Sequence, residues 1–208
     1  MGAGWPVELA EGLVLLRPLR RRDGPDWRRV RAANRDWLDP WEASSPDPAT
    51  PPRSFPAVVR DLRKQAREGR ALPFVIDYEG RLAGQLTVGG IMWGSARSAH
   101  LGYWVDRRVA GRGVAPTAVA LAVDHAMFTL GLHRIEVNIR PENTASLRVV
   151  AKLGFRDEGL REAFLHINGA WRDHRTFALT VEDVPAGLLP RWRAAGRSLQ
   201  DRPKSDDA

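Results

Sequence analysis

A glycine-rich turn between a strand-like segment and a helical one carries the clearest chemical signal in this sequence. The turn spans residues 108–115, and Gly111 and Gly113 lie two positions apart within it. Glycine lets a backbone turn tightly, and the first N–H groups of a helix have no carbonyl partner inside it. Such a turn can bind a phosphate or pyrophosphate group. It could also be a tight connection and nothing more, because glycine-rich turns before helices are common.

A second cluster starts at Asn143 and leads into another helical segment. The sequence Asn-Thr-Ala-Ser covers residues 143–146, and the helix that follows ends at Leu153-Gly154-Phe155. In type, order and separation, this cluster and the turn at 108–115 resemble the GNAT superfamily of N-acetyltransferases. The resemblance extends over residues 12–183. In that superfamily the turn holds the pyrophosphate of coenzyme A, and the helix led by asparagine flanks the pantetheine arm.

The resemblance implies that the chain binds acetyl-coenzyme A as its acyl donor. Residues of the strand end, the turn and the second helix are implied as contacts: Trp104, Val105, Arg108, Gly111, Arg112, Gly113, Val114, Ala115, Asn143 and Ser146. Trp104 and Val105 would pair with the pantetheine arm through their backbone, as an added strand does. Arg108 and Arg112 could neutralise phosphate, or they could be solvated loop residues.

Transfer of an acetyl group from a thioester to an amine also requires a group that stabilises the departing thiolate. Many members of the superfamily place a tyrosine seven residues after the asparagine, but here that position is Val150, which has no proton to donate. Ser146 is the expected substitute, an arrangement that resembles the Rim-type ribosomal-protein alanine N-acetyltransferases. Tyr103 is the rival acid. Ser146 could also be an ordinary serine on a helix surface.

Glu136 is the candidate for the base that accepts the proton of the amine. It alternates with Ile135 and Val137, so it points to the opposite face of a strand. A carboxylate there could accept the proton through a water molecule. Glu136 could equally be a surface glutamate, and other carboxylates further along the chain could serve.

Residue types also provide candidates for the acceptor wall and an expectation about metal binding. Trp37 and Trp41 lie in a proline-broken segment where the superfamily builds its acceptor wall, and His174 could contact the acceptor from a hairpin. Each could instead have a packing role. The chain has no cysteine, and its histidines lack the spacing of metal ligands, so no metal is expected.

The remaining sequence supplies the elements that position these residues. Strands are expected at 12–19, 74–77, 82–91, 100–105, 135–140, 155–165 and 170–181, and helices at 23–33, 54–70, 114–130 and 143–153. The resemblance implies the α+β GNAT fold, a mixed, mostly antiparallel twisted sheet of about six to seven strands flanked by about four helices. We expect one domain over residues 12–183 and a partly disordered tail over 184–208.

Composition is consistent with that domain. The 208 residues are 43% hydrophobic, enough to bury a sizeable core, and carry a net charge of +7. No apolar run approaches the ~20 residues that span a bilayer. A cytoplasmic monomer or homodimer without membrane attachment is expected. The arginines between residues 17 and 35 could attract a polyanion such as RNA near the ribosome, or they could form a solvated helix face.

Three functions fit these features. The first is acetylation of a protein N-terminus, with a ribosomal protein as the family-based expectation. The second is acetylation of a small amine such as an antibiotic or polyamine, and the third is non-catalytic binding of acyl-coenzyme A. The intact turn, together with Asn143 and Ser146, favours an enzyme. The identity of the acceptor and the length of the acyl group stay open.

Overall fold

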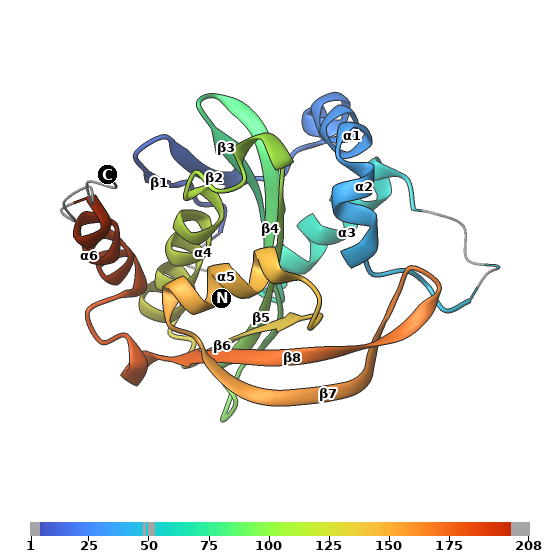
Figure 1. Ribbon diagram of the computed structural model, residues 1–208. Helices are drawn as coiled ribbons and strands as arrows, with labels where there is room; N and C mark the ends of the chain where they lie inside the picture. Colours follow the sequence, from blue (N-terminus) through green and yellow to red (C-terminus); the bar gives the residue numbers. More distant parts are fainter. Residues whose placement is uncertain (1–4, 48, 50–52, 201–208) are drawn as a thin grey trace, which may run out of the picture.

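The computed structural model describes residues 5–47, 49 and 53–200, and within them eight strands form a single mixed sheet (Figure 1). The strand order is β1-β2-β3-β4-β5-β6-β8-β7. Neighbouring strands are antiparallel except β5 and β6, which are parallel. The fold is therefore α+β with a mixed, mostly antiparallel sheet, as the sequence predicts.

The strands are β1 (Leu9–Glu11), β2 (Val14–Pro18), β3 (Leu72–Tyr78), β4 (Arg81–Met92), β5 (Ser98–Val105), β6 (Arg134–Ile139), β7 (Arg156–Ile167) and β8 (Ala170–Thr180). The α-helices are α1 (Gly24–Ala33), α2 (Arg35–Leu38), α3 (Phe55–Arg67), α4 (Val114–Asp124), α5 (Thr144–Leu153) and α6 (Leu188–Gln200). Short 3-10 helices occur at η1 (Arg21–Asp23), η2 (Asp39–Trp41), η3 (Arg107–Val109) and η5 (Val181–Asp183), and α4 continues into the π-helical turn η4 (His125–Thr129).

The sheet separates two apolar clusters. Phe74 and Ile76 of β3 pack with α4 and α5, whereas Val75 packs with α1 and α3 on the opposite face. Successive side chains of a strand point to opposite faces, so a central strand that is buried on both sides reads as a continuous apolar run. In Figure 1, α4, α5 and α6 lie on one side of the sheet and α1 and α3 on the other.

Helix α4 is the central helix of the larger cluster. Every residue from Val114 to Val123 is buried. Its circumference of alanine and valine, with no charge before Asp124, fits this position, because a helix that is apolar all round is stable only when it is covered on all sides.

Two predicted segments differ in the structure. The strand expected at 12–19 is β2, and the sequence does not predict β1, which precedes Gly12 and pairs with β2, so the sheet has one strand more than the expected upper number. The short α2 and the C-terminal α6 bring the α-helices of the described chain to six.

The chain after residue 184 does not begin as a tail. Asp124 caps α6 by accepting hydrogen bonds from the backbone N–H groups of Leu188 (2.6 Å) and Leu189 (3.0 Å). Leu188 is fully buried, and α6 packs against α4. The expectation of disorder concerns mainly residues 201–208, which lie outside the described residues.

Strands β5 and β6 separate toward their C-terminal ends. Their parallel pairing joins Ser98 with Arg134, Ala99 with Ile135 and His100 with Glu136, and the ladder ends there. The rest of β5, residues 101–105, pairs with β4 alone. A gap of this kind leaves one edge of β5 available to an extended ligand.

Candidate active site

A cavity of about 980 Å³ lies beside the C-terminal end of β5. One half of the cavity, here called the donor half, is formed by the end of β5, the glycine turn with the start of α4, and α5. Its lining residues are Tyr103, Trp104, Val105, Val109, Ala110, Gly111, Gly113, Val114, Ala115, Pro116, Asn143, Ala145, Ser146, Arg148, Val149 and Lys152. The other half, here called the acceptor half, comes from α1, α2, α3, β4, the segment 41–47 and Arg53. Residues from distant parts of the chain thus share one hollow.

The glycine turn has the geometry of an anion cradle. Gly111 and Gly113 have φ angles of +82° and +79°, a left-handed conformation that side chains disfavour. Gly113 is the N-cap of α4, so the N–H groups of Val114 and Ala115 lie in the first turn of the helix, where no intrahelical carbonyl reaches them. Gly113, Val114 and Ala115 line the donor half of the cavity, so the positive end of the helix dipole lies at its wall.

The two arginines of the turn lie apart from the cavity wall. Neither Arg108 nor Arg112 lines the cavity. The Arg108 side chain is 74% exposed and donates from Nε to Oδ2 of Asp106 over 2.9 Å. Burial alone would raise the pKa of Asp106, but the hydrogen bonds from Arg108 and Asn34 outweigh burial and lower it. The charge of Arg108 is therefore paired with a buried carboxylate.

The expected acid candidates do come together. The Asn143 side chain accepts a hydrogen bond from the Ser146 N–H over 3.1 Å and so caps α5, and both residues line the cavity. Tyr103 lines the same wall, and its hydroxyl is buried with no hydrogen-bond partner among the described residues. Burial raises the pKa of Tyr103 to about 12, an effect that the neighbouring Ser146 hydroxyl opposes without reaching hydrogen-bond geometry. Tyr103 thus keeps its proton at neutral pH and can donate it in a hydrogen bond.

Glu136 is not brought to this wall. It does not line the cavity, and it accepts hydrogen bonds from Arg134 (2.9 Å) and Arg161 (3.2 Å) instead. The alternation correctly placed Glu136 on the face of β6 opposite Ile135 and Val137, but the cavity lining does not extend to Glu136. It could not tell which of the two sheet faces the cavity would use.

Among the described residues, Glu42 and Asp47 supply the carboxylates of the cavity lining. Sequence reasoning missed both, since they lie in a proline-broken segment without periodicity. Their placement depends on a long-range contact: Ala43 bridges Ile167, and the Ser44 N–H donates to the His166 carbonyl over 2.9 Å. The end of β7 thus fixes the segment on the acceptor side.

Aromatic side chains line the acceptor half. Trp37 and Trp41 are on its wall, which is one of the two positions that the sequence left open, together with Trp27. The Arg31 guanidinium lies 5.0 Å from the ring centroid of Trp27 and 5.6 Å from that of Trp104, and it forms an ion pair with Glu42.

His174 packs elsewhere. It is 4% exposed and makes an edge contact with Phe164, away from the cavity lining.

Comparison with known families agrees with this geometry. The family model described as an acetyltransferase (GNAT) domain matches residues 14–156. The chain belongs to this family and is a GNAT N-acetyltransferase with the α+β GNAT fold. In the described part of the chain, no helix is long and apolar enough to cross a bilayer.

Within the family, the similarity points to the Rim type. A structure of Mycobacterium smegmatis RimJ in complex with CoA-disulfide is 43% identical with a TM-score of 0.89, over 95% of this chain and 98% of that one. The [ribosomal protein uS5]-alanine N-acetyltransferase of Escherichia coli is 30% identical over 185 residues, which are 87% of this chain and 94% of that protein. The "Probable N-acetyltransferase YjcK" of Bacillus subtilis is 30% identical over 172 residues, 82% of this chain and 95% of that protein. The chain is therefore a RimJ-like GNAT acetyltransferase.

Proposed function

We propose that this protein transfers the acetyl group of acetyl-CoA to the N-terminal α-amine of a protein, with a ribosomal protein as the acceptor class. The observation that carries the proposal is the single cavity in which the glycine turn and an aromatic, partly acidic wall flank Tyr103 and Ser146. The similarity to M. smegmatis RimJ, whose structure contains CoA, and to the uS5 alanine acetyltransferase supports both the donor and the acceptor class.

The donor half suits the pyrophosphate and the pantetheine arm of acetyl-CoA. The amides of residues 113–115 would receive the pyrophosphate, and the free edge of β5 would pair with the amide-rich pantetheine arm. The Arg148 and Lys152 side chains of α5 add positive charge to the wall. Arg112 and Arg108 would act from the surface, through the field around the turn.

Attack of the amine nitrogen on the thioester carbonyl forms the C–N bond, breaks the C–S bond and releases the thiolate with its electron pair. Ser146 and Tyr103 serve this step as hydrogen-bond donors. Full transfer of the Tyr103 proton would be uphill, because its pKa of about 12 exceeds the ~8.5 of an ordinary thiol. A hydrogen bond aimed at developing charge stabilises the transition state without that transfer.

The amine proton places a light demand on the site. An α-amino group has a pKa of ~7.7–8.0, so a substantial fraction is neutral near pH 7.5, whereas lysine at ~10.4 is almost wholly charged. The neutral amine attacks, and the nitrogen then loses a second proton once the C–N bond has formed. That proton passes through water to the carboxylates of Glu42 and Asp47. Positioning of the amine contributes more than proton abstraction.

A small cationic amine is the second candidate acceptor. Tryptophan faces and carboxylates, which both occur on the acceptor wall, attract ammonium groups of any size. The test is kcat/KM for short peptides that begin with Ala or Ser, for the same peptides N-blocked but containing Lys, and for polyamines and aminoglycosides. We expect the free α-amine peptides to rank first. A polyamine or aminoglycoside ahead of every peptide would overturn the protein acceptor.

A further inference from the structure

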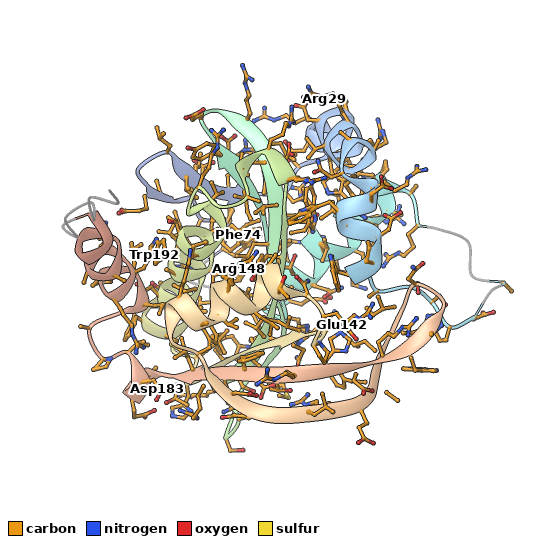
Figure 2. The ribbon with its side chains drawn as sticks, viewed as in Figure 1. Arg29, Phe74, Glu142, Arg148, Asp183 and Trp192 are labelled. Carbon is orange, nitrogen blue, oxygen red and sulfur yellow. The ribbon has the colours of Figure 1, made fainter. Side chains whose placement is uncertain are left out.

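The C-terminal helix α6 contacts the back of the glycine turn. Trp192 donates a hydrogen bond from Nε1 to Oγ1 of Thr117 over 2.9 Å, and Thr117 in turn donates its backbone N–H to the Gly113 carbonyl over 3.1 Å. The Trp192 ring lies 3.5 Å from the point that a Cβ on Gly113 would occupy. Figure 2 shows Trp192 on the side of α6 that faces α4. One side chain therefore bonds to the first turn of α4 and fills the space beside its N-cap.

The same helix reaches the end of α5, which forms the opposite wall of the donor half. The Arg191 guanidinium lies 2.8 Å from the point that a Cβ on Gly154, the C-cap of α5, would occupy. A cation at a helix C-terminus is stabilised by the free carbonyls there. Helix α6 thus joins the start of α4 to the end of α5 behind the cavity.

The position of Trp192 is fixed from the start of its helix. Asp124 holds the first N–H groups of α6, and Leu188 is fully buried in the main apolar cluster. Trp192 itself does not line the cavity, so any influence on a ligand passes through Thr117 and Gly113.

We propose that Trp192 is a positioning residue for donor binding. Two glycines with left-handed backbone leave the turn free to sample many conformations unless neighbours restrain it. Trp192 restrains it through packing and one hydrogen bond, so that the amides of residues 113–115 are preorganised before a pyrophosphate arrives. Without that restraint, the ligand itself must supply the free energy of ordering the turn. The inference rests on the proposed binding of acetyl-CoA at this turn.

The test is isothermal titration of acetyl-CoA into the full chain, carried out well below the melting temperature of each variant. Trp192→Phe keeps one aromatic ring but loses the N–H donor and the rest of the indole, so it removes the hydrogen bond and part of the packing. We expect affinity about fivefold weaker, with the loss in the entropic component. Thr117→Val removes the acceptor of the same bond and should have a similar effect. The double variant should bind about as weakly as Trp192→Phe alone, because the hydrogen bond that Thr117→Val removes is already absent there.

Arg193→Ala is the matched control, since Arg193 follows Trp192 on the same helix but pairs with Glu11 of β1. Its affinity for acetyl-CoA should equal that of the wild type. Wild-type affinity in Trp192→Phe and Thr117→Val would overturn the proposal, and so would an equal loss in Arg193→Ala, which would reduce α6 to a general stabiliser. Absence of binding by the wild-type chain would refute the proposed donor site first, and the role of Trp192 with it.

Discussion

Asn34 donates a hydrogen bond from Nδ2 to Oδ1 of Asp106 over 3.1 Å, and both side chains are buried, with 5% and 3% of their surface exposed. Asn34 lies at the junction of α1 and α2, where its carbonyl accepts the N–H of Trp37. Its Oδ1 also accepts the N–H of Arg107, at the start of the donor turn. One amide group therefore connects the junction of α1 and α2 to the chain that leads into the glycine turn.

We expect Asn34→Ala to impair both halves of the cavity. Asp106 would lose a buried partner, at a cost of about 1–3 kcal/mol in the free energy of unfolding. The relaxed junction should weaken acetyl-CoA affinity and raise the acceptor KM together. Urea denaturation, calorimetric titration and steady-state kinetics measure the three effects.

Asn138→Ala is the control for this variant, because it removes a side-chain hydrogen bond, to Thr176, from a residue outside the cavity lining. It should lower stability and leave both substrate parameters near their wild-type values. Unchanged donor affinity and acceptor KM in Asn34→Ala would show that the junction does not couple the two walls.

Gly111→Val and Gly113→Val should each abolish measurable binding of acetyl-CoA while most of the fold persists. A left-handed conformation costs an ordinary residue about 1–2 kcal/mol, and more when the side chain is β-branched, so the turn should leave the cradle geometry. Gly80→Val is the control, since Gly80 has φ +74° in the β3–β4 turn and does not line the cavity. Calorimetric titration decides the matter, and undiminished affinity in folded Gly111 and Gly113 variants would exclude the turn as the donor site.

The donor half of the site was predictable because its signals are local. Gly111, Gly113, Asn143 and Ser146 occupy turns and helix starts whose geometry follows from a few neighbouring residues. The alternation of apolar and polar residues in β6 likewise identifies a half-buried strand, and the apolar residues around α4 identify a buried helix, without reference to the rest of the chain.

The placements of Glu42 and Trp192 depend on contacts that no local pattern encodes. Glu42 reaches the cavity because its neighbour Ala43 bridges Ile167 at the end of β7. Trp192 reaches α4 because Asp124 caps a helix that is distant in sequence. Both placements need the assembled sheet, so a single sequence read for periodicity cannot give them.

Ser146→Ala should lower kcat by about 10²–10³ while acetyl-CoA affinity changes little, because the hydrogen bond strengthens only as charge develops on sulfur. Tyr103→Phe is the companion variant on the same wall. Single-turnover kinetics with an Ala-initiated peptide separate chemistry from binding. A wild-type rate in Ser146→Ala together with a slow Tyr103→Phe would transfer the role to the phenol.

The buried phenol of Tyr103 should also make stability depend on pH in the alkaline range. Burial raises its pKa to about 12 in the folded protein, above the ~10 of an exposed tyrosine. The folded state therefore retains the proton longer, and this contribution to stability is full below about pH 10 and lost as pH rises toward 12. The wild-type unfolding free energy should fall relative to that of Tyr103→Phe over that window, and parallel curves would contradict the burial of the hydroxyl.

Glu136→Gln and Glu42→Gln together test which carboxylate interacts with the acceptor amine. Glu136 is paired with Arg134 and Arg161 outside the cavity lining, so its neutral variant should keep kcat within about twofold and lose less than about 1 kcal/mol of stability. Glu42 lies on the acceptor wall, and loss of its charge should raise the KM of an α-amine peptide about tenfold through a missing charge-assisted hydrogen bond. Acetyl-CoA affinity, measured by titration, should remain unchanged in both variants. A fall of about 10²–10³ in kcat for Glu136→Gln with intact acetyl-CoA binding would instead identify β6 as the source of the base.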